Sequence, residues 1–492
     1  MHGRMKLVLY HPRAAEKRFR LPVSVITLAS VVVDEADVVI VDADLLDDPL
    51  PELRRQVSQA GAILCVTVMP GPQLSRAVPH CRQLRKEFPA LTIIWGGWFP
   101  SLHAETCLSV PYVDIVLRGR GEIAFPLLIR ALTSGLPLVD VPNVSYRTPD
   151  GAFHHNPEAP LQHPDKMPRM PYHLVPVEKY SQRSWLGSQS SVYHSSFGCP
   201  LKCGFCAVAA QFEGHWMGQS VPRMMEDIEP LLAAGVNAIE FLDNNFFVSE
   251  KRVHEFALAM MGRGVSWWGE GTIDGLLRYK DETLRDMRAG GCKMIFFGAE
   301  SGSDEVLKLY NKGGLVAASS LVLAERFKQF DIVPEFSFVL GSPICPKEDI
   351  EASIGLILKL KEVNPICEII MYLYSPEPYQ NSALWEAAQK YGYKFPENLE
   401  AWAEDAHRMF NMRRALETPW LEPADVARVH DFEAVLHAYH PGISDIELGP
   451  RWRRVLRVLA TPRYKLKAYR KPEILKLALR AARHRRVEQE GL

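Results

Sequence analysis

Three cysteines, Cys199, Cys203 and Cys206, stand close together within the segment SSFGCPLKCGFCAVAA, residues 195–210. The glycines and the proline between them favour a loop over a helix buried in a core. Clusters that only transfer electrons commonly use four cysteines. Three thiolates on one loop can therefore bind three irons of a cubane iron–sulfur cluster and leave the fourth iron open to a small molecule. Two alternatives are weaker, because structural zinc needs a fourth ligand and buried packing does not need a loop.

This loop resembles the signature of the radical S-adenosylmethionine (radical SAM) superfamily, and residues 296–313, FFGAESGSDEVLKLYNKG, are similar to that family's fourth-strand block. The resemblance implies that the three cysteines are the catalytic metal ligands of a 4Fe–4S cluster. The open iron would bind S-adenosylmethionine, and an electron would cleave it to a 5′-deoxyadenosyl radical. The resemblance also implies a cofactor-binding role for Phe205, Asp243, Glu300, Ser301 and Gly341. Glu300 and Ser301 would equally suit the start of a helix, where a carboxylate and a capping hydroxyl are favourable.

Residues 1–145 alternate short apolar runs with stretches long enough for crossover helices. The predicted strands are residues 6–11, 37–41, 62–68, 91–95 and 113–117. This alternation predicts a Rossmann-like, doubly wound parallel sheet with helices on both faces. Ligands of such sheets bind beyond the carboxyl ends of the strands.

Small residues gather where three of these strands end, and glycine there lets a backbone approach a large ligand closely. Ordinary turns are the alternative for each glycine pair taken alone. Together the loops resemble the cobalamin-binding domain that precedes many radical SAM enzymes. The resemblance implies cobalamin contacts from Thr67, Val68, Met69, Gly96, Gly97, Trp98, Gly119, Gly121 and Glu122.

One mark of cobalamin proteins is absent. The sequence after His11 does not match the Asp-x-His-x-x-Gly motif whose histidine binds cobalt. Relatives in the radical SAM branch that lack this histidine cover the lower face of cobalt with the loop after the third strand. His103 is an alternative axial candidate, although packing is the favoured interpretation of that residue.

The remaining chain divides into three predicted parts. Residues 146–190 are rich in proline and predict an interdomain linker, in which the histidines at 154, 155, 163 and 173 are expected to be solvated rather than metal ligands. Residues 191–390 repeat strand-then-helix units and resemble the partial (β/α)6 TIM-type barrel of radical SAM enzymes. Their predicted strands are residues 238–242, 265–268, 294–297, 333–339 and 368–374. Residues 391–492 are predicted to be helical.

Four further residues of the barrel region could face a substrate. Cys345 follows the turn sequence Gly341-Ser342-Pro343, and Tyr372, Tyr374 and Tyr379 lie near the last predicted strand. Packing is the favoured interpretation of Cys345 and an open alternative for the three tyrosines. The six cysteines outside the loop have no second cluster spacing, so an auxiliary iron–sulfur centre is not expected.

Composition limits the compartment. The chain has nine cysteines, an odd number, and no secretory leader is evident, which predicts a reducing, cytoplasmic interior. The apolar run at residues 21–33 is too short to span a bilayer. Residues 451–486 hold 14 Lys and Arg against one acid, Glu473. This basic tail could dock on the protein's own acidic body, which is favoured, or touch a membrane or lipid substrate, with nucleic acid the weakest alternative.

The resemblance as a whole implies a cobalamin-dependent radical SAM methyltransferase. Such an enzyme methylates an unactivated carbon through a 5′-deoxyadenosyl radical and methylcobalamin. Its expected partners are a small-molecule or lipid-like substrate and an external electron donor of the flavodoxin or ferredoxin type. An oxidative cyclase or ring-rearranging enzyme with the same cofactors is the alternative, and a cobalamin-binding sensor without catalysis is a remote one.

Overall fold

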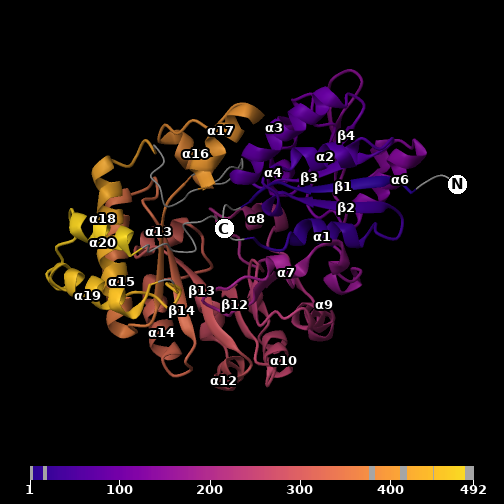
Figure 1. Ribbon diagram of the computed structural model, residues 1–492. Coiled ribbons are helices and arrows are strands. Elements are labelled where there is room, and N and C mark those ends of the chain that lie inside the picture. Colours follow the sequence, from indigo (N-terminus) through magenta and orange to yellow (C-terminus); the bar gives the residue numbers. More distant parts are fainter. Residues whose placement is uncertain (1–3, 15–18, 376–382, 411–417, 447, 483–492) are drawn as a thin grey trace.

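The computed structural model describes residues 4–14, 19–375, 383–410, 418–446 and 448–482. Two sheets with their helices make up most of the molecule, and a group of helices lies at the end away from the N-terminal sheet (Figure 1). No helix in these ranges is both long enough and apolar enough to cross a membrane.

The N-terminal sheet is doubly wound, as the sequence predicts. Its five parallel strands are β1 (Lys6–His11), β2 (Asp37–Asp42), β3 (Ile63–Thr67), β4 (Thr92–Gly96) and β5 (Ile115–Leu117), arranged in the order β2-β1-β3-β4-β5. The crossover helices are α1 (Val23–Ser30), α2 (Leu50–Val57), α3 (Pro72–Glu87), α4 (Trp98–Leu102), α5 (Ala104–Leu108) and α6 (Ala124–Ser134). Leu7 and Leu9 belong to one core cluster and Val8 and Tyr10 to another, all wholly buried. Both faces of the sheet are therefore covered, which explains its continuous apolar strands.

Two antiparallel strands extend this sheet beyond β5. They are β6 (Val144–Arg147) and β7 (Phe153–His155), and a turn at residues 148–151 joins them. The segment predicted as an irregular linker thus begins inside a hairpin. The hairpin is hard to see in the sequence because β7 is short and buries none of its side chains fully. The later part of the segment has only the short helices η3 (Pro164–Lys166), η4 (Tyr172–Leu174) and α7 (Val177–Tyr180).

The second sheet is an open barrel of six parallel strands. In spatial order these are β8 (Ser190–Tyr193), β11 (Ala238–Phe241), β12 (Ser266–Gly271), β13 (Cys292–Glu300), β14 (Val333–Leu340) and β15 (Glu368–Leu373). Its larger outer helices are α9 (Val221–Ala233), α10 (Glu250–Met260), α12 (Asp281–Ala289), α14 (Ala317–Phe327) and α15 (Pro346–Val363), with the shorter α11 (Ile273–Leu277) and α13 (Asp304–Leu309) between them. Because β8 and β15 do not pair, the partial (β/α)6 barrel is confirmed. β12 and β13 run past their predicted ends, so Glu270 and Glu300 lie in strands rather than in loops.

The C-terminal helices divide between the two sheets. α16 (Ala383–Lys390) and α17 (Leu399–Phe410) return to the N-terminal domain, where α17 contacts α3. Trp385, Leu399 and Trp402 join the core cluster that contains Trp95. By contrast, α18 (Pro423–Tyr439), α19 (Pro450–Lys465) and α20 (Glu473–Ala481) pack against the barrel (Figure 1). Amphipathic helices do not reveal which sheet they cover, so the sequence predicts one helical segment here and not its division.

Candidate functional site

The cysteine loop lies between β9 (Ser196–Gly198) and α8 (Ala207–Phe212) and rests on the turn after α13. The Gly204 N–H donates to the Tyr310 carbonyl oxygen at 2.8 Å, and the Asn311 amide donates to the Lys202 carbonyl oxygen at 3.2 Å. The rings of Phe205 and Tyr310 are 5.0 Å apart. These contacts fix the loop on the block of sequence that also contains Glu300.

The three cysteines of the loop differ in burial. Cys203 is buried, whereas Cys199 and Cys206 are partly exposed. Burial raises the pKa of Cys203 to about 11, while the nearby Lys312 ammonium acts to lower it. A metal ligand must be a thiolate, so this neighbouring cation favours the form that binds iron.

Glu300, the last residue of β13, has a strained backbone. Its φ of 61° is unusual for a residue with a side chain, and the β13–β14 register shifts between Gly298 and Glu300. The carboxylate pairs with Lys312, and a side chain at Gly298 would collide with both charged groups. Strain of this kind concentrates at functional sites. The geometry therefore places a held carboxylate and a cation beside the cysteine loop.

Asp243 orders the segment that leads into the loop. It is wholly buried and accepts hydrogen bonds from the Ser195 N–H at 3.0 Å, the Ser195 hydroxyl at 2.7 Å and the Ser196 hydroxyl. The buried guanidinium of Arg252 donates to the Ser195 carbonyl oxygen at 3.2 Å. Asp243 is thus a positioning residue for β9, and Arg252, which the sequence analysis missed, shares that role.

Ser301 and Gly341 meet at a second missed residue, Asp349 on α15. The Asp349 carboxylate accepts from the Gly341 N–H at 3.0 Å, the Ser342 N–H at 3.5 Å and the Ser301 hydroxyl. Burial raises the pKa of Asp349 to about 6, while these hydrogen bonds act to lower it. In the sequence Asp349 resembles an acid in the first turn of a helix. The structure shows that it joins the ends of β13 and β14.

Glu270 is a third residue that the sequence did not single out. It lies near the end of β12, and burial raises its pKa to about 7. Lys312, Asp243 and Glu300 are among the charges that act on it. Glu270 therefore lies near the charged residues that surround the cysteine loop. Its carboxyl group has no hydrogen-bond partner among the residues that the structure describes.

The loops after β3 and β4 are joined to each other. The Val68 N–H donates to the Gly96 carbonyl oxygen at 2.8 Å, and the Phe99 N–H donates to the Val68 carbonyl oxygen at 3.1 Å. A Cβ at Gly97, whose φ is 99°, would lie 2.9 Å from the Val68 nitrogen and oxygen, so glycine is required. The Val68 side chain is wholly buried in the core, whereas Met69 is 42% exposed. Val68 can therefore face a ligand only with its backbone, whereas Met69 can face a ligand with its side chain.

Four more of the predicted cobalamin residues lie on these loops. Thr67 ends β3, with its hydroxyl 3.4 Å from that of Ser24, and partly buried Trp98 begins α4. The Gly119 N–H donates to the Ser101 hydroxyl at 2.9 Å, and Gly121 closely approaches α1. The loops after β3, β4 and β5 therefore form one continuous surface at the carboxyl edge of the sheet.

Arg120, in the loop after β5, contacts the segment that joins the barrel strand β8 to the cysteine loop. Its guanidinium pairs with Glu122 and lies 3.2 Å from the ring centroid of Phe197 in β9, directly before the cysteine loop. The Glu122 carboxylate is therefore engaged by a neighbour in the chain. A small pocket opens at this junction, and its lining includes Gly119, Arg120, Phe197, Phe212 and Met217.

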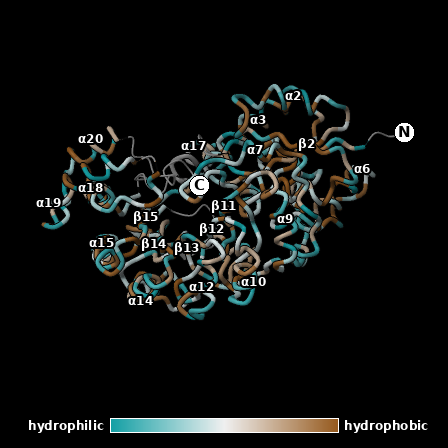
Figure 2. The backbone as a smooth tube through the Cα atoms, turned by 60° about the horizontal axis from the view of Figure 1, so that its bottom comes forward, coloured by the Kyte–Doolittle hydropathy of each residue, from teal (hydrophilic) through white to brown (hydrophobic). Residues whose placement is uncertain are grey.

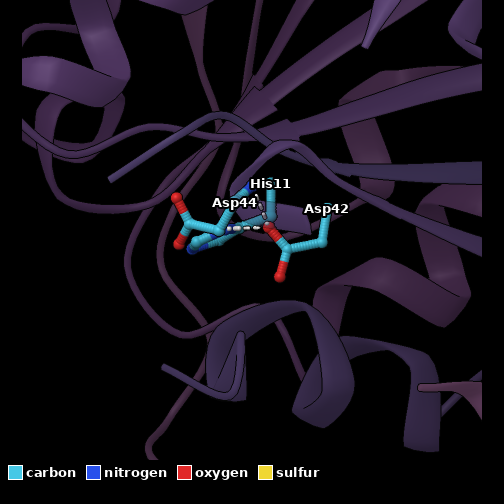
Figure 3. A group of neighbouring side chains, drawn as sticks. All are labelled: His11, Asp42 and Asp44. Carbon is cyan, nitrogen blue, oxygen red and sulfur yellow. Dashed lines mark hydrogen bonds and ion pairs between the residues drawn. The ribbon is translucent and has the colours of Figure 1, made fainter. Parts of the chain in front are cut away.

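A network at the ends of β1 and β2 joins His11, Asp42 and Asp44 (Figure 3). Donor atoms of the three residues lie within 4.8 Å of one another, the only such group of metal-ligand type in the described ranges. His11 Nδ1 is 3.1 Å from Asp42, which also accepts from the Tyr180 hydroxyl at 2.7 Å. The Asp44 carboxylate accepts from the Ala14 N–H at 3.0 Å. Since its polar atoms already bond within the protein, this is a structural network.

The network supports the loop after β3. His11 Nε2 is 2.9 Å from the Gln73 side-chain nitrogen, and the Gln73 oxygen accepts from the Met69 N–H at 3.0 Å. Burial alone would lower the pKa of His11, but the hydrogen bond and charge of Asp42 outweigh it and raise that pKa. His11 thus acts on the predicted cobalamin loop through Gln73.

His103, the alternative axial candidate, lies in an aromatic cluster. Its ring stacks on Phe99 at 4.7 Å and lies 5.1 Å from Trp402, and burial lowers its pKa to about 4. A neutral, packed imidazole accounts for this position.

The other candidates are spread over the molecule. Cys345 is exposed, Tyr372 and Tyr374 are buried, and Tyr379 lies outside the described residues. The linker histidines do not form a metal-type group in the part of the chain that the structure covers.

Unsatisfied polar atoms mark the space beside the cysteine loop. His194 Nε2, whose ring lies 5.1 Å from that of Phe197, and Asn245 Oδ1 are buried without a hydrogen-bond partner among the described residues. The Asn245 side-chain nitrogen is 3.6 Å from the Cys199 sulfur. Buried polar groups nearly always have partners. The site therefore fits an iron–sulfur cluster with a polar ligand, because it combines three thiols with a cation and with buried polar atoms that have no hydrogen-bond partner among the described residues.

Comparison with known proteins agrees with this geometry. The radical SAM superfamily model matches residues 193–357, from the end of β8 into α15. This segment is a radical SAM domain. The chain is 28% identical over 375 residues to an uncharacterised methyltransferase of Pyrococcus horikoshii, covering 75% of this chain and 78% of that protein. It is 29% identical over 238 residues to an anaerobic magnesium-protoporphyrin IX monomethyl ester cyclase of Synechocystis, covering 47% of this chain and 46%, less than half, of the cyclase.

The fold likeness extends beyond the radical SAM domain. The structure of the radical S-adenosylmethionine methyltransferase TsrM from Kitasatospora setae, with cobalamin and a 4Fe–4S cluster bound, superposes with a TM-score of 0.64 at 15% identity. The match covers 97% of this chain and 100% of that one. The arrangement of N-terminal sheet, radical SAM domain and C-terminal helices is therefore shared.

Proposed function

We propose that the protein is a cobalamin-dependent radical SAM methyltransferase that adds a methyl group to an unactivated carbon of a small-molecule or lipid-like substrate. The observation that carries the proposal is the contact of Arg120 with Phe197, which brings the predicted cobalamin loops next to the cysteine loop. The fold likeness to TsrM and the similarity to a methyltransferase of Pyrococcus horikoshii support it.

The residues divide into those that would touch cofactors and those that position them. Cys199, Cys203 and Cys206 would hold the cluster, with Glu300 and Lys312 beside S-adenosylmethionine. The loops with Thr67, Met69, Gly97, Trp98 and Gly119 would receive the corrin. Asp243, Ser301 and Glu122 are engaged within the protein and would act by positioning. When bound, the cofactors supply the radical and methyl-transfer chemistry, and the chain orients them and excludes water.

A cyclase or ring-rearranging reaction is the second candidate, favoured by the similarity to the Synechocystis cyclase. A cobalamin sensor without catalysis is a remote candidate, because it would not need the cysteine triad. Reaction products separate the three.

The test is anaerobic purification and reconstitution with iron, sulfide and cobalamin, followed by an assay with dithionite in place of the external flavodoxin or ferredoxin-type donor. The methyltransferase is expected to form both 5′-deoxyadenosine and S-adenosylhomocysteine and to add one CH2 unit to the substrate. 5′-Deoxyadenosine without S-adenosylhomocysteine would favour the cyclase. Cobalamin binding without either product, even with candidate substrates present, would favour the sensor.

A further inference from the structure

Helix α19 exposes an apolar stripe on its outer side. Trp452, Val455, Leu459, Pro462 and Leu466 follow one another at intervals of three and four residues and are all exposed. This spacing places them on one face of a helix. Leu466, directly after the helix, is 77% exposed, and Val458 beside the stripe is 66% exposed.

The short helix α20 adds to this surface. Ile474 and Leu477, three residues apart, are 72% and 67% exposed. Other positions on both helices supply the packing, because Leu456, Ala460 and Leu475 are buried in the barrel core cluster. The exposed apolar residues are therefore not needed to attach α19 and α20 to the protein.

The same surface is strongly basic. Residues 451–482 contain 11 Lys and Arg against one acid, Glu473. Lys476 pairs with Asp431 on α18, so docking on the body uses part of this charge. Arg451, Arg454 and Lys465 are exposed, and no hydrogen bond or ion pair joins their side chains to another residue in the described ranges. These cations flank the apolar stripe.

We propose that α19 and α20 form a peripheral binding surface for a bilayer that contains anionic phospholipid. Apolar side chains between cations are the pattern of helices that lie in the membrane interface. Each cation near an anionic surface adds about 1 kcal/mol, or roughly fivefold, to binding. A second copy of this chain would bring two basic surfaces together, and nucleic acid would leave Leu466 and Ile474 without an apolar environment.

This surface lies at the end of the molecule opposite the N-terminal domain (Figures 1 and 2). The inference is independent of the reaction, and its test measures binding alone. The full-length reconstituted protein is sedimented with vesicles of phosphatidylcholine, with or without phosphatidylglycerol. Binding is expected only with phosphatidylglycerol and is expected to weaken as salt is added.

Two sets of variants separate charge from apolar insertion. Arg451→Gln with Arg454→Gln is expected to lower the partition coefficient roughly 25-fold, at about fivefold for each charge. Leu466→Asp with Ile474→Asp is expected to lower it more than about tenfold through lost apolar burial. The matched control is Val322→Asp on α14, where Val322 is 58% exposed but lies outside the basic surface. It should bind as the unmodified protein does.

Three results would overturn the proposal. One is failure of the unmodified protein to bind the anionic vesicles, and another is full binding by the Leu466→Asp, Ile474→Asp variant. The third is a dimer of the unmodified protein in sizing experiments, if the Leu466→Asp, Ile474→Asp variant is a monomer. A second copy of the chain would then cover the stripe. Duplex DNA that binds through the arginines, with no vesicle binding, would point to nucleic acid instead. Because all substituted side chains are exposed, circular dichroism of each variant should match the unmodified protein.

Discussion

The Gln73 side chain joins the His11 ring to the backbone of Met69. The Gln73 side-chain nitrogen lies 2.9 Å from His11 Nε2, and the Gln73 side-chain oxygen accepts a hydrogen bond from the Met69 N–H at 3.0 Å. The exposed Met69 is thereby held by a buried network that continues through Asp42 to Tyr180 in the segment between the domains. Buried hydrogen bonds thus fix the position of the loop that is proposed to lie under cobalamin.

Replacing Gln73 by leucine is expected to weaken cobalamin binding about tenfold, the scale on which partners of metal-site residues act. The reason is the loss of the bond that fixes Met69. Equilibrium dialysis of hydroxocobalamin and the electron paramagnetic resonance spectrum of the reduced cobalt measure the effect. Gln83→Leu on the same helix is the control, since the Gln83 side chain bonds to Glu87 at 3.0 Å and to no other residue that the structure describes. Equal affinity in the two variants would contradict a role for the network.

Cys203→Ala is expected to abolish the 4Fe–4S cluster, because three thiolates are the proposed minimum for holding it. Iron and sulfide content and the visible absorbance of the reconstituted protein measure the loss. Cys345→Ala removes an exposed cysteine outside the loop and should leave the cluster intact. A cluster that survives in Cys203→Ala would place the iron elsewhere.

Asp349→Asn is expected to destabilise the protein by about 1–3 kcal/mol and to weaken S-adenosylmethionine binding, because three donors lose a charged acceptor. Thermal unfolding and equilibrium dialysis with S-adenosylmethionine test the two effects separately. Glu348→Gln changes the adjacent, exposed carboxylate and should alter neither quantity. If Asp349→Asn lowers stability without changing binding, Asp349 supports the fold alone.

Glu270 predicts a pH dependence of stability in the cofactor-free protein. Its pKa is raised from 4.5 to about 7, so the folded state holds a proton that the unfolded state releases earlier. This carboxyl group therefore lowers stability progressively as pH rises from about 4.5 to about 7. Glu270→Gln removes the titration and should be more stable than the unmodified protein above pH 7, by at most about 3 kcal/mol.

That difference should disappear near about pH 4. Unfolding midpoints across this range test it, with Glu282→Gln, an exposed residue on α12, as the control. A constant difference between Glu270→Gln and the unmodified protein at all pH values would show that Glu270 does not titrate in this way.

The sequence predicts the five parallel strands of the N-terminal sheet and five of the six barrel strands, because buried strands appear as short apolar runs. It does not predict β6, β7 or the first barrel strand, β8. It does predict the cysteine loop, because metal-ligand spacing is local. The partners that hold the site are not local. Asp243 lies 48 residues from Ser195, and Asp349 lies 48 residues from Ser301. Only the arrangement of strands brings each pair together.

Conformation at single residues was equally invisible in the sequence. The positive φ of Glu300 depends on the register shift between β13 and β14, and a glutamate gives no warning of it. The acid at Glu270 lies beyond the predicted end of its strand, so its half-buried position could not be foreseen.

The packing of α16 and α17 means that the N-terminal domain is built from two separate stretches of the chain. Trp385 and Trp402 complete the aromatic core around Phe99 and His103. A fragment ending before the barrel would therefore leave that core open to water. A chimera that exchanges the N-terminal domain with that of a relative must therefore include residues 383–410 as well as the sheet. In evolution, too, this domain can be replaced only as a discontinuous unit.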